Sequence, residues 1–491
     1  MNLTPEQHTV VEYCKSHYSD TSSELVLINA IAGSGKTTLL TAIAKTLQHT
    51  NGLYICYNKS IATEAATKFP TTTACSTTHS LAYRAVVKQL GLRVGTFNYR
   101  SIDMSVPYEF KLLVLDSIKE FCVSEHLSFE QFAADNEFDE FLANTCSHYL
   151  SLMESGKIEC SHDFYLKAFH IMLASGELEY PKFDFVMIDE SGDVNLVTLA
   201  IFRLLPAKLK IAVGDIAQNI YSFNHTINAF EHLAEEGTLF NMTQSFRVSS
   251  EIASRIETFC QTFVQPSMSF KGVPLADNHI KSRAYITRTN AGLIAKMIEL
   301  SKSGTPYSLV RKASDIFSLP LMVCGFKYQG AIHVPGYKHL QHDIDDWYEA
   351  DVKQRASSLF THLAEIYAAD YALIQAMKLV IKHGKTDIMS TYLDAKHHEG
   401  SKHGLVLLTA HSAKGLEMDE VTIAPDLNQI VKLVVENNFD QKFNPKKQIS
   451  VEDLNELNLA YVAASRARKA LHSADFLNLD YYDFQVSLTL D

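Results

Sequence analysis

The stretch ELVLINAIAGSGKTTLLTAI, residues 24–43, decides the fold of the chain. Its first seven residues form a short apolar run, which predicts a buried strand. A glycine-rich turn follows, and after it apolar residues recur at helical spacing, at Leu39, Leu40, Ile43 and Leu47. A strand, a glycine-rich loop and a helix in this order form the structural context of a phosphate-binding loop.

The loop AIAGSGKT, residues 30–37, contains the residue types that phosphate binding requires. Glycines let backbone N–H groups approach phosphate oxygens, a lysine neutralises their charge, and a threonine hydroxyl can bind Mg²⁺. The strict pattern has glycine at position 30, where this chain has Ala30. We predict a nucleotide site, with ATP as the ligand, formed by Ala32, Gly33, Ser34, Gly35, Lys36 and Thr37.

A later apolar run, FVMIDE at residues 185–190, ends in paired carboxylates. Downstream of a phosphate-binding loop, Asp189 can hold Mg²⁺ and Glu190 can orient or deprotonate the attacking water. Acidic residues often end strands for structural reasons, but an Asp-Glu pair that closes an apolar run favours the catalytic interpretation. The sequence therefore predicts ATP hydrolysis, with Thr37 and Asp189 as ligands of Mg²⁺.

Apolar runs that alternate with helical patterns predict an α/β fold with parallel sheets. One set of candidate strands lies at 24–30, 53–58, 183–190 and 209–215, and a second lies at 283–288, 405–411 and 420–426. Two sets predict two α/β domains, one at 1–92 and 166–240, the other at 241–315 and 403–491. The stretches 93–165 and 316–402 lack strand signals and are predicted to be helical insertions.

The composition is that of a globular protein, with 46% hydrophobic and 20% charged residues among 491. A formal net charge of −12 argues mildly against a nucleic-acid partner, although a groove between domains needs only local positive charge. Eight cysteines without a C-x-x-C pair argue against zinc or iron–sulfur sites. Without a secretory signal or a membrane-length apolar run, we expect no membrane partner and a cytoplasmic protein, nuclear if the source is eukaryotic.

A series of motifs, in order along the chain, resembles superfamily 1 helicases of the UvrD/Rep group. They are LTPEQ (3–7), YNKSIATEA (57–65), STTHSLAY (76–83), VGDIAQNIYSF (213–223), QSFR (244–247), ITRTN (286–290), TAHSAKGLEMDEV (409–421) and LAYVAASRARKAL (459–471). Within the group the chain is most similar to the F-box DNA helicases, through THSLAY and SHDFYLKAFHI (161–171). We expect no F-box segment before the motor, because the first motif begins at residue 3.

The resemblance implies two RecA-like motor domains that grip one ATP. Arg247 and Arg466, on the second domain, would approach the γ-phosphate as arginine fingers, which are worth roughly 10³–10⁵ in rate. Gln218 would sense the γ-phosphate and couple its state to the DNA. The adenine edge, the adenine face and the ribose would be contacted by Gln7, Phe246 and Glu417, respectively.

The same resemblance implies a track for single-stranded DNA. Tyr221 and Phe223 would stack on unpaired bases, a contact worth about 1–3 kcal/mol per base that tolerates any sequence. Alternate aromatic residues on a short strand are also typical of core packing. His79 alone would be interpreted as a packed or capping residue, and its place in TTHSLAY favours a DNA contact. Backbone contacts are expected from Asn58, Lys59, Thr78, His79, Thr409 and His411.

The chain departs from the family pattern at three positions. Gly192 in DESGD (189–193) replaces a glutamine, which predicts a looser backbone and a missing coupling hydrogen bond. Asn224 stands where an arginine often follows, which predicts a weaker DNA contact. Thr38 replaces the arginine that covers adenine in UvrD-like members, so stacking on the base is expected from one side only.

We therefore expect an ATP-dependent DNA helicase that acts as a monomer, moves 3′–5′ on single-stranded DNA and opens forked duplexes in repair, recombination or replication. The direction rests on the resemblance alone. The alternative is a single-strand-dependent ATPase that remodels nucleoprotein complexes without processive unwinding, with a recombinase or single-strand-binding protein as partner. A third possibility, a non-catalytic scaffold, is disfavoured by the intact set of catalytic residues.

Overall fold

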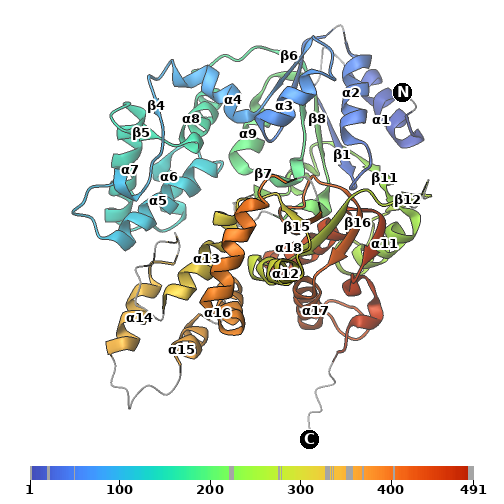
Figure 1. Cartoon of the computed structure of the whole chain (residues 1–491). Coiled ribbons are helices and arrows are strands. Elements are labelled where there is room, and N and C mark those ends of the chain that lie inside the picture. The colour runs from blue at the N-terminus through green and yellow to red at the C-terminus, as the bar shows by residue number, and fades with distance from the viewer. Residues whose placement is uncertain are drawn as a thin grey trace, which may run out of the picture. The chain divides into compact units, whose positions relative to one another are not determined.

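The computed structural model describes residues 3–18, 23–48, 50–220, 226–274, 277, 279–326, 332, 334, 337–349, 358–367, 370–401 and 404–484. The chain divides into two compact units, unit 1 at Met1–Gln244 and unit 2 at Ser245–Asp491. Each unit contains a parallel sheet flanked by helices (Figure 1). The predicted α/β fold class is thus confirmed, while the four-part division into two domains with two insertions stays a prediction.

Unit 1 is built on a six-stranded sheet in the order β10-β1-β8-β6-β2-β3, in which all neighbouring strands are parallel. Alternate residues of β1 face two cores, with Leu27 on one side of the sheet and Val26 and Ile28 on the other. Both faces are buried, which explains why the inner strands β1 and β6 are almost unbroken apolar runs. The strands are β1 (Glu24–Ala30), β2 (Gly52–Ile55), β3 (Thr73–Ser76), β6 (Phe183–Ile188), β8 (Ala207–Gly214) and β10 (Thr238–Met242).

Two groups of helices pack around the two cores that flank this sheet. The core that contains Val26 and Ile28 is closed by α1 (Pro5–Ser16), α2 (Lys36–Thr46) and α3 (Lys59–Ala66). The core that contains Leu27 includes residues of α4 (Thr78–Ala82), α5 (Tyr108–Val123), α6 (Phe129–Asp135), α7 (Glu140–Glu154), α8 (His162–Ser175), α9 (Leu196–Leu204) and α10 (Ala229–Leu233). A π-helical turn at Tyr83–Val87 continues α4.

Short strands also occur outside the main sheet of unit 1. The segment 93–165 was predicted to contain no strand, and this is wrong at its two ends. There β4 (Arg93–Val94) pairs in parallel with β5 (Glu159–Cys160). Elsewhere β7 (Val194–Asn195) pairs antiparallel with β9 (Thr226–Ile227). Two-residue strands have no hydrophobic alternation, so the sequence carries no signal for them.

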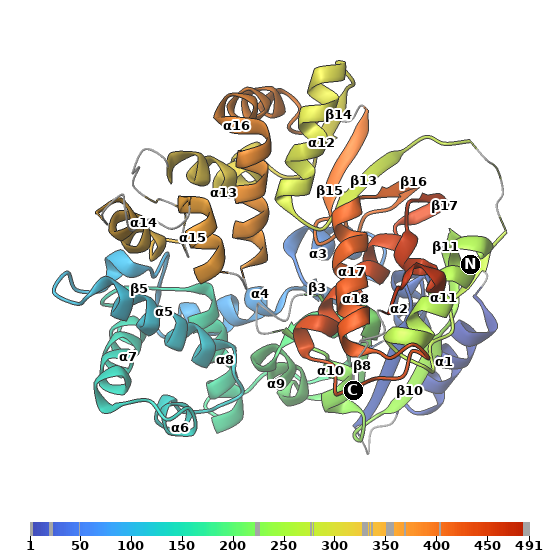
Figure 2. The ribbon, with the colours of Figure 1, turned by 90° about the horizontal axis from the view of Figure 1, so that it is seen from below.

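Unit 2 has a five-stranded parallel sheet in the order β14-β15-β13-β16-β17. Its strands are β13 (Arg283–Thr287), β14 (Tyr307–Leu309), β15 (Leu405–Thr409), β16 (Met418–Ile423) and β17 (Ala467–His472), and a separate pair is formed by β11 (Gln244–Ser249) and β12 (Lys271–Val273). Figure 2 shows the helices of unit 2, which are α11 (Ser250–Phe263), α12 (Asn290–Ser303), α13 (Ala313–Gly325), α14 (Leu340–Glu349), α15 (Leu359–Ile366), α16 (Tyr371–His397), α17 (Pro425–Asn438) and α18 (Val451–Ala464). Helix α16 is broken at Gly384, where φ is 72° and ψ is 167°.

All seven predicted strands exist, with shifted ends. The prediction 24–30 has the observed bounds, whereas the prediction 53–58 extends three residues too far, because the chain leaves the sheet after Ile55 to begin α3. Strands β3, β10, β14 and β17 were not predicted. They lie at the edges of the two sheets. Alternating burial interrupts the apolar pattern of β10, whereas β14 is fully buried but has only three residues, too few to show a pattern.

Candidate functional site

The loop between β1 and α2 has a backbone shape that only glycine adopts without strain. Gly33 and Gly35 have φ values of 76° and 80°, in the left-handed region. Gly35 caps α2 without any side-chain hydrogen bond, so the first N–H groups of that helix are not capped by a side chain. The Ser34 hydroxyl is buried and has no hydrogen-bond partner in the described part of the chain. Uncapped N–H groups at a helix start form a site for an anion such as phosphate.

Gln7 links helix α1 to this loop through a hydrogen bond. Its side-chain Nε2 donates to the carbonyl oxygen of Ser34 at 3.1 Å, and its Oε1 accepts from the Thr4 N–H at 3.1 Å. The Gln7 N–H in turn donates to the Thr4 hydroxyl, which completes a capping box at the start of α1. The buried amide therefore positions the loop, and its predicted contact with adenine stays a prediction.

The two carboxylates predicted for catalysis follow β6 directly and reach the loop. Asp189 is the first residue after β6, which ends at Ile188. Its N–H donates to the carbonyl oxygen of Ile55 on β2 at 2.9 Å. Glu190 Oε2 lies 3.2 Å from Lys36 Nζ. Glu190 has a φ of 54°, a backbone conformation that is uncommon for a residue with a side chain. Such a conformation persists only where the surrounding structure enforces it. The structure thus brings Lys36, Asp189 and Glu190 together.

The electrostatics of this cluster are unusual because its charged side chains lie close together in a partly buried position. Burial lowers the pKa of Lys36, but the carboxylates of Glu190, Asp189 and Asp215 outweigh that effect and raise it. Burial and the neighbouring Glu190 together raise the pKa of Asp189. Three carboxylates around one ammonium leave an excess of negative charge, and that excess favours a bound cation.

A divalent ion fits this donor set. The Thr37 hydroxyl and the Asp189 carboxylate are hard oxygen donors, the kind that Mg²⁺ prefers, and Mg²⁺ sites commonly use one or two protein ligands with substrate phosphates. Across the described residues, no group of three or more His, Cys, Asp or Glu side chains could hold a metal ion. An ion at this site would therefore depend on phosphate oxygens and water for its remaining ligands.

The segment after Asp189 and Glu190 packs tightly against the end of β8, which corrects the prediction of a looser backbone at Gly192. Gly192 is buried in a 3₁₀ turn, Ser191–Asp193. A Cβ atom there would lie 2.8 Å from the carbonyl oxygen of Asp215, too close for any side chain. Glycine is thus what allows the two segments to touch, and glutamine could not occupy this backbone position without a shift.

Gln218 is linked to Asp215, the residue that Gly192 approaches. Its Nε2 donates to Asp215 Oδ2 at 2.5 Å, and both side chains are buried. Asp193 Oδ1 accepts from the Ile220 N–H at 3.4 Å. The predicted sensor of the γ-phosphate is thus tied by backbone and side-chain contacts to the segment that follows Glu190.

In unit 2 the structure brings two further predicted nucleotide residues together. Arg247 Nε donates to Glu417 Oε2 at 2.9 Å, and Arg468 lies 3.6 Å from the same carboxylate. The neighbouring Phe246 is 52% exposed, so its ring has a free face for stacking. Arg247 lies on β11 and Glu417 lies in the loop between β15 and β16. The two residues are 170 positions apart, so the sequence alone does not show that they are in contact.

Arg466 is placed differently, because its side chain is only 2% exposed. Its guanidinium donates to the carbonyl oxygens of Val462 and Leu416, at 2.8 and 3.3 Å, and to the Ser465 hydroxyl at 2.9 Å. These contacts lie within unit 2. The predicted approach of Arg466 to a γ-phosphate stays a prediction, and it requires that some of these hydrogen bonds be exchanged.

The residues predicted to contact DNA have clear local roles in unit 1. Asn58 caps α3 by accepting from the Ile61 N–H at 2.9 Å, and Lys59 is exposed at the first position of that helix. Thr78 is buried at the start of α4. His79 Nε2 lies 3.7 Å from Asp163 Oδ1 on α8, a contact that lowers the pKa of Asp163. The segment SHDFYLKAFHI thus meets THSLAY through Asp163 and His79.

In unit 2, Thr409 is the last residue of β15 and His411 lies in the turn that follows. Thr409 is buried and exchanges hydrogen bonds with Ser412. Burial, followed by the charges of Arg288 and Arg311, lowers the pKa of His411 to about 4, so this imidazole is neutral at pH 7. Tyr221, Phe223 and Asn224 lie outside the described residues. All of these DNA contacts stay predictions.

The sequence analysis missed two residues next to Lys36 and Asp189, namely Asp215 and Tyr54. Asp215 ends β8 as Asp189 ends β6, so a carboxylate at a strand end next to the phosphate loop was an available signal. Tyr54 lies in the middle of β2, and its hydroxyl donates to Asp189 Oδ2 at 2.6 Å. A tyrosine inside an apolar run is read as a core residue, so nothing in the sequence pointed to it.

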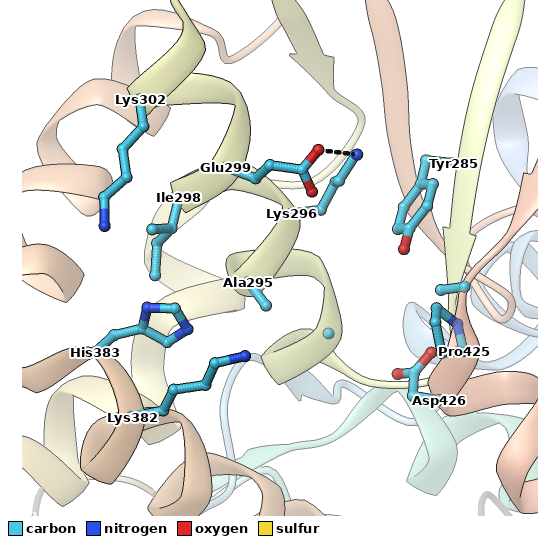
Figure 3. Close-up of a pocket in the computed structure, with 12 residues that line it drawn as sticks. Tyr285, Ala295, Lys296, Ile298, Glu299, Lys302, Lys382, His383, Pro425 and Asp426 are labelled. Carbon is cyan, nitrogen blue, oxygen red and sulfur yellow. Dashed lines mark hydrogen bonds and ion pairs between the residues drawn. The ribbon is translucent and has the colours of Figure 1, made fainter.

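A cavity of about 460 Å³ in unit 2 is a separate feature (Figure 3). It lies between α12, α16 and the start of α17, and the residues predicted for nucleotide or DNA contact are absent from its described lining. Its charges are largely compensated, since Lys296 pairs with Glu299 at 2.6 Å and Lys302 with Asp387 at 2.9 Å. The cavity therefore does not compete with the loop of unit 1 as the nucleotide site.

The strand, the left-handed glycines, the uncapped helix and the paired carboxylates define unit 1 as a P-loop nucleotide-binding fold. A family described as an AAA domain matches residues 16–224.

Two similar proteins cover nearly the whole chain. F-box DNA helicase protein 1 of Schizosaccharomyces pombe is 25% identical over 540 residues, which include 96% of this chain and 57% of that protein. F-box DNA helicase 1 of Gallus gallus is 25% identical over 539 residues, 96% of this chain and 49% of that protein. A shorter match, 28% identity over 103 residues, covers 18% of this chain and 8% of an ATP-dependent helicase/nuclease protein from Natranaerobius thermophilus.

The site and these similarities together support a superfamily 1 helicase. It spans about half the length of the F-box relatives that it matches. In the described part of the chain, no helix combines the length and apolar character that crossing a membrane requires.

Proposed function

We propose that the protein is an ATP-dependent DNA helicase that moves 3′–5′ on single-stranded DNA and separates duplex strands. The observation that carries this proposal is the partly buried cluster of Lys36, Asp189 and Glu190 at the end of a loop shaped by two left-handed glycines. The similarity to proteins named DNA helicases supports DNA as the track. The 3′–5′ direction, the role in repair, recombination or replication, the action as a monomer and the location in the cytoplasm or nucleus remain parts of the proposal.

The residues of unit 1 suit an in-line attack of water on a terminal phosphate. Lys36 places a positive charge beside the phosphates, and the uncapped N–H groups of α2 add hydrogen-bond donors. A Mg²⁺ ion bound by Thr37 and Asp189 would neutralise charge that develops on the phosphate oxygens. Glu190 is placed to orient the water and accept its proton once phosphates have taken over the contact with Lys36.

Gln218 would carry the state of the nucleotide to the DNA. It is linked to the segment after Glu190 through Asp215 and the close approach at Gly192. The segment that follows Gln218 contains Tyr221 and Phe223, the residues predicted to stack on bases. A shift at the phosphates would therefore be transmitted over only a few residues.

A forked DNA substrate tests this function. Duplexes of the same sequence with a 3′ single-stranded tail, a 5′ tail or no tail are incubated with the protein, Mg²⁺ and ATP. We expect strand separation with the 3′ tail and none without ATP. Equal unwinding from both tails would remove the assigned direction. ATP turnover and displacement of a bound protein without strand separation would favour a nucleoprotein remodeller, the alternative function.

A further inference from the structure

Tyr54 makes a hydrogen bond that packing alone does not require. It lies in β2, next to β6, with Tyr54 opposite Met187. The residue is 1% exposed, and its ring packs 4.7 Å from that of Phe69 in the core beneath α1, α2 and α3. A phenylalanine would fill the same space. The hydroxyl is therefore the part of this side chain that needs an explanation.

The partner of that hydroxyl is a predicted metal ligand. Tyr54 Oη donates to Asp189 Oδ2 at 2.6 Å, a short distance typical of a hydrogen bond to a carboxylate. The other carboxylate oxygen, Oδ1, accepts from the Glu190 N–H at 2.9 Å. One donor thus comes from the neighbouring strand and the other from the left-handed residue that follows.

Two donors on opposite oxygens fix the plane of a carboxylate that could otherwise rotate. Each oxygen keeps a further lone-pair direction for an ion or a water molecule. Partners of this kind, which hold a metal ligand without touching the metal, commonly change metal affinity by about 10–100-fold when they are removed. Asp189 therefore has its orientation set before any nucleotide binds.

We propose that Tyr54 is a positioning residue for the divalent ion of the nucleotide site, acting through Asp189. The ligand class is Mg²⁺ together with a nucleoside di- or triphosphate. This inference rests on the proposed function in one respect, the use of Asp189 as a ligand of the ion. It goes beyond that function by assigning part of the metal affinity to a buried tyrosine outside all the helicase motifs.

The test uses Tyr54→Phe in the full chain, because this change removes one oxygen atom and preserves the ring. Binding of a fluorescent ADP analogue is measured as a function of Mg²⁺ concentration, and again with EDTA. We expect the Mg²⁺ concentration at half-maximal binding to rise about 10-fold. Binding in EDTA should be unchanged, since the loop contacts to phosphate are intact.

The matched control is Tyr307→Phe in unit 2. It removes a hydrogen bond of the same kind, from Tyr307 Oη to Asp394 Oδ2 at 3.0 Å, from a buried tyrosine that lies in no predicted site. We expect its Mg²⁺ dependence to match that of the wild type. Thermal unfolding of both variants without nucleotide shows how much stability each bond contributes, separately from Mg²⁺ binding.

A second variant shows whether Tyr54 acts through Asp189. Asp189→Asn should itself weaken Mg²⁺-dependent binding, and combining it with Tyr54→Phe should add no further loss, because residues that act as one unit are not additive. Independent, additive losses would overturn the proposal. So would wild-type Mg²⁺ dependence in Tyr54→Phe alone, and in that case DNA-stimulated ATP turnover would still support the proposed function. Altered Mg²⁺ dependence in a protein without DNA-stimulated turnover would support the role of Tyr54 and contradict the motor.

Discussion

The candidate nucleotide residues are held in opposite ways in the two units. In unit 1 the backbone does most of the positioning, through two left-handed glycines, an uncapped helix start and two strands that end side by side. In unit 2 the arginines are occupied by internal partners, Glu417 for Arg247 and backbone carbonyls for Arg466. The comparison indicates a preorganised loop in unit 1, whereas the role proposed for the arginines of unit 2 requires them to exchange partners.

The largest effect is expected from Lys36→Ala, which tests the preorganised side. Removing the ammonium should lower ATP turnover by about 10³-fold or more, at the upper end of what one lost electrostatic contact costs. Affinity for single-stranded DNA, measured by fluorescence anisotropy, should remain measurable. The control is Lys45→Ala, an exposed lysine in the last turn of the same helix. Normal turnover in Lys36→Ala would show that the loop does not bind the reacting phosphate.

Arg466→Ala tests the side that must exchange partners. It should slow hydrolysis by roughly 10³-fold, as the loss of an arginine finger does, while nucleotide binding persists. It also leaves the buried carbonyls of Val462 and Leu416 without this donor, so the melting temperature should fall. Single-turnover hydrolysis with saturating ATP separates the two effects. A stable variant with a normal rate would remove Arg466 from the reaction.

Gly192→Ala sharpens the comparison within unit 1. The added Cβ would meet the Asp215 carbonyl oxygen at 2.8 Å, where both partners are backbone. We expect a loss of about 1–3 kcal/mol in the free energy of unfolding, the usual cost of overpacking, and weaker stimulation of ATP turnover by DNA. Gly325→Ala is the control, since a Cβ there meets nothing within 4 Å. Equal stability of the two variants would contradict the close approach.

The smallest effect is expected from Asp163→Asn, at the contact between α8 and His79. The contact with His79 lowers the pKa of Asp163, so its stabilisation is present at neutral pH and lost as pH falls below the ordinary range of an aspartate. Because both side chains are about one-third exposed or more, the gain is about 1 kcal/mol or less. Thermal unfolding at pH 7 and pH 3 should show a small difference between the variant and the wild type that is smaller at pH 3. An equal difference at both pH values would exclude the contact with His79 as its cause.

The sequence predicted the fold class and the strand, loop and helix order around residues 30–37 well, because both depend on local patterns. Strands β1 and β6 are long apolar runs, and Gly33, Gly35, Lys36 and Thr37 occur at fixed spacing. It failed where contacts join distant segments. The tight packing at Gly192 depends on Asp215, and the role of Tyr54 depends on which strand lies next to β6. Neither neighbour can be read from local periodicity.

Arginine placement shows the same division. The motifs single out Arg247 and Arg466, but only the fold shows that Glu417 already pairs with one and that the other is buried. Charge pairs across 170 residues leave no local signal in a single sequence. For this reason the sequence predicts which groups take part in the site, and the structure shows the contacts that each described one makes.

The most direct test of the central claim is the rate of ATP hydrolysis by the wild-type protein with and without single-stranded DNA. A motor whose phosphate site is preassembled, and whose arginines must be recruited, should hydrolyse ATP slowly alone. We expect DNA to raise that rate at least tenfold, on the order of a 1.4 kcal/mol change in barrier. A rate that is equally fast without DNA, or no hydrolysis in either condition, would contradict the account.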